Sequence, residues 1–96
     1  MIKHIVCFKL AEPTEAACQK CKEVLLSMVG NVPMIRDIEV GVDVLHSPRS
    51  YDVYLAVTVD DRVALDAYQN DKYHCEVVKT HMHAVTAASV AVDFEI

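Results

Sequence analysis

Hydrophobic and polar residues alternate along four segments of the chain, and this two-residue period is typical of half-buried β-strands. The segments cover residues 2–10, 34–45, 51–59 and 86–95. Between the first two, residues 14–29 predict an amphipathic helix, because apolar side chains recur there at three- and four-residue spacing. These side chains are Ala17, Cys21, Val24, Leu25 and Met28.

The second half of the chain predicts two further helical segments. Asp60 and Asp61 can cap the free N–H groups at a helix start, and this helix runs to about Gln69. Asn70-Asp71-Lys72 weakens the helix, and a second helical stretch covers about residues 73–83. Its expected buried stripe consists of His74, Val77, Val78, His81 and Val85. The order β-α-β-β-α-β predicts an α+β, ferredoxin-like fold, with helices on one face of a four-stranded antiparallel sheet.

Length and composition limit the classes of function. A chain of 96 residues with 53% hydrophobic residues predicts a single folded domain over residues 1–96. The formal net charge of −5 argues against binding to nucleic acid or to anionic lipid. No apolar run approaches the roughly 18–20 residues of a membrane helix, and no targeting signal is visible, so we expect a cytoplasmic protein.

The helix-free face of such a sheet needs polar side chains or a partner. Two strands are apolar on both faces, with Val6, Phe8, Leu55 and Val57 on one side and Ile5, Cys7, Tyr54 and Ala56 on the other. A bare apolar patch of that size is unusual on a monomer. We therefore predict a twofold homodimer in which two helix-free sheet faces pack together, and the alternative is a monomer with a partly wet face of small residues.

Four segments resemble the stress-responsive dimeric A/B barrel family. They are residues 2–10, 33–43, 67–77 and the ending Val92-Asp93-Phe94, and they occur in the order found in the family. The resemblance implies a ferredoxin-like fold and a dimer whose two sheets form a β-barrel. It implies no single function, because most members of the family have none assigned.

One branch of the family, plant polyketide cyclases resembling olivetolic acid cyclase, implies candidate catalytic residues. In that branch a Tyr and a His six residues later work together near a His on the first strand, and Tyr68, His74 and His4 match these positions. The chain departs from the branch where it has Asp71-Lys72 in place of His-Pro. It also departs at two polar pocket positions of the cyclase, which fall on about Leu25 and Val53.

The chemistry of these three side chains has two interpretations. A His of near-neutral pKa can act as a general base, and a Tyr hydroxyl can donate to a substrate oxygen as charge develops. Tyr68 and His74 are about 120° apart on an unbroken helix, so they converge only if the backbone breaks between them. The alternative is a packed Tyr68, a His74 at a helix start and a hydrogen-bonded His4 in the core.

Two other constellations are weaker. His74, Cys75, His81 and His83 have the composition of a metal site, but His74 and His81 would lie about 10 Å apart along a helix, too far for one ion. Cys18-Gln19-Lys20-Cys21 is a CxxC placed inside a helix rather than after a strand, which favours buried, reduced thiols over a redox site. We expect no bound metal or cofactor.

Three functions remain open. The first is a homodimeric domain that binds a small apolar ligand, and the second is a cofactor-free cyclase, isomerase or lyase acting on a small carbonyl compound through Tyr68 and His74. A haem-degrading monooxygenase is the third and has the least support. A cavity of about 300 Å³ or more around Tyr68, His74 and His4 would favour the enzyme. A space filled by side chains such as Leu25 and Met28 would favour the binding domain.

Overall fold

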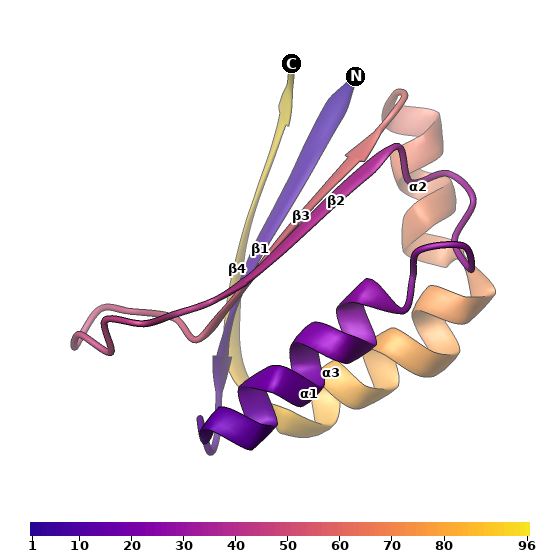
Figure 1. Ribbon diagram of the computed structural model, residues 1–96. Helices are drawn as coiled ribbons and strands as arrows, with labels where there is room; N and C mark the ends of the chain where they lie inside the picture. Colours follow the sequence, from indigo (N-terminus) through magenta and orange to yellow (C-terminus); the bar gives the residue numbers. More distant parts are fainter.

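The structure, a computed structural model, describes all 96 residues as a sheet with helices on one face (Figure 1). The elements are β1 (Ile2–Leu10), α1 (Glu15–Leu26), β2 (Asp37–Val42), β3 (Val53–Val59), α2 (Arg62–Asn70), the π-helix η1 (His74–Lys79), α3 (Thr80–Val85) and β4 (Thr86–Glu95). This order confirms the predicted α+β, ferredoxin-like arrangement. No helix combines the length and the apolar character that a membrane crossing requires.

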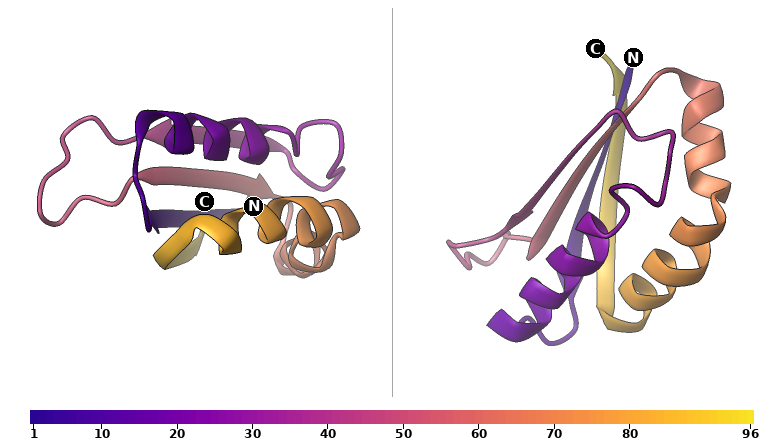
Figure 2. Two further views of the ribbon diagram at one scale, coloured as in Figure 1. Left: turned by 90° about the horizontal axis from the view of Figure 1, so that it is seen from below. Right: turned by 45° about the vertical axis from the view of Figure 1, so that its right-hand side comes forward.

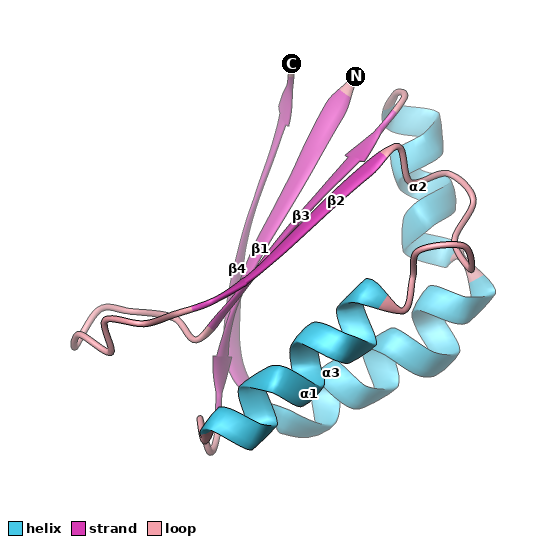
Figure 3. Ribbon diagram, viewed as in Figure 1, coloured by secondary structure: helices cyan, strands magenta, loops and turns pink.

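The four strands form one antiparallel sheet in the order β2-β3-β1-β4. The central strand β1 pairs with both neighbours, so that His4 lies opposite Val57 of β3 and opposite Asp93 of β4. All helices lie on one side of the sheet, and the other side is bare (Figures 1 and 3). The two termini lie close together at one end of the sheet (Figure 2).

The core lies between the sheet and the helices. Its innermost side chains are Leu25 and Met28 from the α1 side, Val53, Val57 and Val59 from β3, Tyr68 from α2 and Val78 from η1. The strand alternation of the sequence places these valines on the helix-covered face, as predicted. Asp61 caps α2 as expected, because its Oδ1 accepts a hydrogen bond from the Ala64 N–H at 2.8 Å.

Four predicted boundaries are wrong by two or three residues. The first helix ends at Leu26 instead of residue 29, and the following turns pass through Gly30, whose φ of 82° is strained for residues with a side chain. The second strand covers Asp37–Val42 instead of 34–45, and the third begins at Val53 instead of residue 51. The early end of the second strand and the late start of the third have one cause, since residues 43–52 leave the sheet as a projecting loop, here called the β2–β3 arm (Figure 1).

The predicted stripe of the second helical stretch is also wrong in part. Val77 is 43% exposed, whereas His74, Val78 and Met82 are buried. The reason is that η1 is wound as a π-helix, which closes its hydrogen bonds over five residues instead of four. The wider winding moves the buried positions to a four-residue spacing, and such turns are frequent at functional sites.

Candidate functional site

Asp71 breaks the helical run between the two candidate residues Tyr68 and His74. Its backbone is extended, with ψ of 136°, and α2 ends just before it. Its carboxylate accepts a hydrogen bond from the His74 N–H at 3.0 Å, and its carbonyl accepts one from the Cys75 N–H at 2.9 Å. The break predicted at Asn70-Asp71-Lys72 is therefore confirmed, and the polar side chain of Asp71 starts the next helical segment.

The break brings the Tyr68 and His74 rings into a stack. Their centroids lie 4.3 Å apart with an interplanar angle of 24°. His4, reaching from β1, meets the Tyr68 ring edge-on at 5.7 Å and 61°. All three side chains are buried, so the structure brings together the residues that the sequence singled out.

Each histidine uses its Nδ1 to bind a protein acceptor. His74 Nδ1–H donates to the Tyr68 carbonyl oxygen at 3.0 Å, and His4 Nδ1–H donates to the Asp93 carboxylate. Both acceptors fix the proton on Nδ1, since a carbonyl or carboxylate oxygen accepts only. No protein group bonds either Nε2, and neither atom is sealed from the surrounding space, because Thr86 Oγ1 is the one buried side-chain N or O atom without a partner.

His4 and His74 both border a cavity of about 220 Å³ between the sheet and the helices. Its walls are mainly apolar and come from β1, α1, β3 and the segment from α2 to α3, with Ser89 and Ala91 of β4 at one side. Lys79 and His83 also border it, and the Lys79 ammonium group donates to the Gln69 carbonyl at 3.0 Å.

Burial sets the protonation of the ring pair. Burial lowers the pKa of His74 from its ordinary value of 6.5, and the nearby Lys79 charge lowers it further. Its imidazole is therefore neutral at pH 7, with an open lone pair on Nε2. Burial raises the pKa of Tyr68 well above its ordinary value, so its hydroxyl stays protonated. That hydroxyl points to the Met28 thioether sulfur, at 3.8 Å.

The lowered pKa of His74 predicts a loss of stability in acid. The unfolded chain takes up the His74 proton first as the pH falls, so stabilisation by the neutral ring is complete above pH 6.5 and is lost from there through the folded-state pKa. Urea unfolding at about pH 7.5 and about pH 5 measures this difference. His74→Phe keeps a stacked ring and cannot ionise, so it is expected to lose less stability than the wild type between the two pH values. An equal loss in both proteins would contradict the lowered pKa of His74 as its cause.

Sequence reasoning missed Asp93 as a site residue. The alternation of β4 groups Asp93 with Ser89 and Ala91, opposite the apolar Val90 and Val92, which is usually a solvent-facing pattern. In the sheet this polar side of β4 faces the helices and the cavity. The pairing of His4 with Asp93 depends on the register of strands 89 residues apart, which no local pattern encodes.

The other candidate constellations do not form a centre. His81 contacts Cys21, with 3.9 Å between Nε2 and Sγ, while Cys75 donates from its thiol to the Gln69 carbonyl. No three His, Cys, Asp or Glu side chains gather as a metal site would require. The CxxC lies within α1, and burial raises the pKa of both the Cys18 and the Cys21 thiol, which disfavours the reactive thiolate.

A match to a family model shows which family the chain belongs to. The model described as "Stress Responsive A/B Barrel Domain" matches residues 2–96. The chain belongs to this family. The family resemblance of the sequence is thereby confirmed over nearly the whole chain. No curated protein matches the chain.

Solved structures of the same fold include three bacterial proteins of low sequence identity. A dimeric ferredoxin-like protein of unknown function from Thermobifida fusca YX is 22% identical, with a TM-score of 0.85 over 99% of this chain and 90% of that one. A dimeric protein of unknown function from Bacteroides fragilis NCTC 9343 is 23% identical, with a TM-score of 0.83 and coverages of 99% and 95%. A stress-responsive A/B barrel family protein from Mesorhizobium loti MAFF303099 is 17% identical, with a TM-score of 0.76 and coverages of 99% and 95%.

Proposed function

We propose that this family member is a homodimeric domain that binds a small, largely apolar molecule in the cavity between the sheet and the helices. One observation carries the proposal: His4 and His74 border one mainly apolar cavity, and the Nε2 atom of each has no hydrogen-bond partner in the protein. Apolar walls favour a hydrocarbon body, and the two ring nitrogens favour one polar group on it, such as a hydroxyl or a carbonyl.

The size of the cavity supports binding over catalysis. Its volume of about 220 Å³ lies below the volume of about 300 Å³ that would favour the enzyme, and Leu25 forms part of its wall. A cavity of about 150 Å³ holds benzene, so a single ring with one substituent fits this one. The Tyr68 hydroxyl already donates a hydrogen bond to the Met28 sulfur, so it is not free to bind a substrate oxygen. This further favours the binding domain over the enzyme.

Phenol is a suitable probe, because it combines one ring with one hydroxyl. We expect phenol to bind with a Kd of about 1 mM, given its few atoms. His74→Ala is expected to weaken binding about three- to tenfold by removing one hydrogen bond. His81→Ala is the matched control, since His81 does not border the cavity. A phenol titration monitored by amide chemical shifts measures the Kd of the wild type and of both variants. Equal affinities of all three proteins would contradict the proposed site.

A second candidate function is proton transfer, and the fixed tautomer of His74 favours it. With Nδ1–H held by the Tyr68 carbonyl, Nε2 is an unprotonated base at pH 7. It would take a proton from the carbon beside a carbonyl; the C–H electron pair then forms an enolate, and the proton returns to carbon from Nε2. The Tyr68 hydroxyl would stabilise the enolate oxygen by leaving Met28, whose thioether is a weak acceptor.

The homodimer is proposed from the helix-free face of the sheet. On this face β4 exposes Val90, Val92 and Phe94, which are 51%, 60% and 41% exposed. In the strand register Val90 lies beside Cys7, Val92 beside Ile5 and Phe94 beside Lys3 of β1. Charged residues on this face are Asp37 and Glu39 of the edge strand β2 and Lys3 and Lys9 near the two ends of β1, so the apolar patch covers the middle of the sheet and β4.

The family is named after a barrel, and this supports a second copy of the chain as the partner. Four twisted strands are too few to close a barrel, whereas eight are enough, so a second sheet is needed. The proteins from T. fusca and B. fragilis are described as dimeric, which fits a second copy as the source of that sheet. The two helix-free faces would then pack together and exclude water from the exposed valines.

A further inference from the structure

The β2–β3 arm carries aliphatic side chains that its own chain leaves uncovered. Val44 is 91% exposed and Leu45 is 76% exposed. The arm projects past the N-terminal end of α1 (Figures 1 and 2). Among the other large apolar residues, Val63 on α2 alone has a similar exposure, at 80%.

The arm is held in this exposed conformation by its own hydrogen bonds. The Asp43 N–H donates to the Asp52 carbonyl at 2.9 Å, and the Asp43 carboxylate accepts from the His46 N–H at 2.7 Å. The hydroxyls of Ser47 and Ser50 are bonded to each other at 2.7 Å. His46 has φ of 55°, a strained value for a residue with a side chain. The fold thus maintains an exposed apolar tip at a conformational cost.

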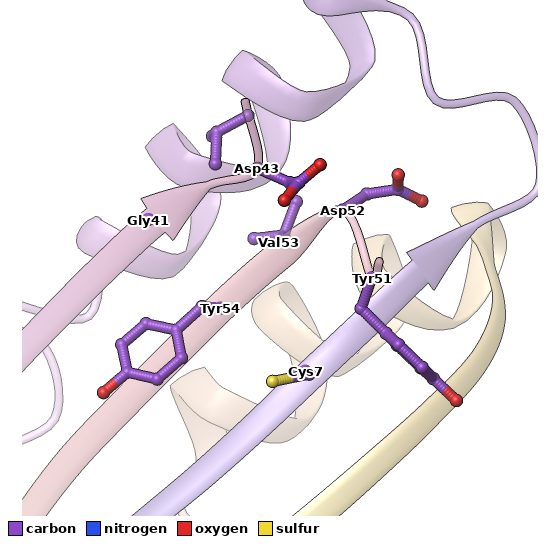
Figure 4. A pocket seen from close by; sticks show the side chains of 8 residues that line it. Cys7, Gly41, Asp43, Tyr51, Asp52, Val53 and Tyr54 are labelled. Atoms are coloured by element: carbon purple, nitrogen blue, oxygen red, sulfur yellow. The ribbon is translucent and has the colours of Figure 1, made fainter. Parts of the chain in front are cut away.

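A hollow connects the arm to the helix-free face of the sheet. It has a volume of about 360 Å³ and lies at the base of the arm, as Figure 4 shows. Cys7 of β1, Tyr54 of β3 and Tyr51 of the arm border it, and Gly41 of β2 contributes no side chain. The arm and the sheet face are therefore one continuous surface, with a recess that can receive side chains.

The sheet alone is small for a stable interface. Four strands about 4.8 Å apart, of nine, six, seven and ten residues at about 3.3 Å each, give a plan area of roughly 510 Å². A standard interface buries about 800 Å² on each partner. The acidic β2 edge reduces the apolar share of the sheet further, so a second copy needs contact area beyond the strands. The arm adjoins the sheet face and supplies such area.

We propose that the β2–β3 arm is a second element of the homodimer interface, in which Val44 and Leu45 of each subunit pack against the other subunit. The inference rests on the homodimer of the proposed function. In a twofold assembly both arms make the same contact, so each substitution in the arm removes two contacts. The apolar tip is then covered in the dimer and exposed only in the free chain.

The test compares the double variant Val44→Ser, Leu45→Ser with Val63→Ser, a matched change at an equally exposed position on α2. Sedimentation equilibrium over a concentration series gives the dimer Kd of each protein. The arm variant is expected to dimerise at least about tenfold more weakly than the wild type, and Val63→Ser is expected to match the wild type. Both sites are exposed in the free chain, so neither variant is expected to change the fold.

Two failures can be told apart. A wild-type dimer whose Kd is unchanged in the arm variant would overturn the role of the arm and leave the homodimer standing. A wild-type protein that sediments at 10.7 kDa at all concentrations would overturn the homodimer and the arm together. Equal weakening by Val63→Ser would also overturn the inference, because the effect would then not belong to the arm.

Discussion

Val92→Asp is expected to convert the proposed homodimer into free chains at micromolar concentration. Val92 is 60% exposed on the helix-free side of β4 and lies beside Ile5 of the central strand. Face-to-face packing would bury the new carboxylate among apolar side chains, which costs several kcal/mol for an unpaired charge. The cost is incurred twice in a symmetric dimer, so a dimer with a Kd near 1 µM would dissociate.

Light scattering after gel filtration measures this change directly. The wild type is expected at about twice the chain mass of 10.7 kDa, and Val92→Asp at the chain mass. Val63→Asp is the control, because it places the same charge on an exposed position of α2. An unchanged far-UV circular dichroism spectrum would show that the fold persists. A Val92→Asp protein that still runs as a dimer would contradict the proposed interface.

The second large effect concerns proton transfer by His74. If Nε2 of His74 is a general base, the protein is expected to accelerate exchange of the α-hydrogens of cyclohexanone in D2O, followed by proton NMR. His74→Ala is expected to lower the protein-dependent rate by about 100-fold or more, the usual contribution of a general base. The rate of the wild type is expected to persist below pH 6.5, because burial lowers the pKa of the base.

The control for this experiment is His81→Ala, which removes an imidazole outside the cavity and is expected to exchange at the wild-type rate. Tyr68→Phe separates the role of the Tyr68 hydroxyl from the role of the Tyr68 ring. It removes the hydroxyl that would stabilise the enolate, and it keeps the ring that stacks on His74. Absence of any rate above buffer in the wild type would contradict the proton-transfer function and leave the binding function to the phenol titration.

The fold was predictable because its elements carry local signals. Alternation identified all four strands, and the Asp61 cap identified the start of α2. The arm and η1 were not predictable in this way. Asp43 and Val44 continue the alternation of β2, yet the chain leaves the sheet after Val42. The π-winding of η1 depends on tertiary packing around His74 and Val78.

The sequence predicted which residues form the candidate site, but it did not predict their hydrogen-bond partners. Asn70-Asp71-Lys72 indicated a break, and the break explains how Tyr68 and His74 stack. The direction of the Tyr68 hydroxyl depends on Met28, which lies 40 residues away in the sequence. Asp93 as the acceptor for His4 depends on the register of β1 against β4. Such long-range pairings follow from the assembled sheet and are invisible to local patterns.

The ring nitrogens of His74 offer the most direct test of the ligand cavity. Long-range ¹H–¹⁵N NMR spectra of ¹⁵N-histidine protein at pH 7 distinguish the two tautomers and report on a bond to Nε2. The account predicts a proton on Nδ1, an unprotonated Nε2, and a shift of the Nε2 resonance when phenol is added. A proton on Nε2 in the free protein, or an Nε2 resonance that phenol leaves unmoved at saturation, would contradict it.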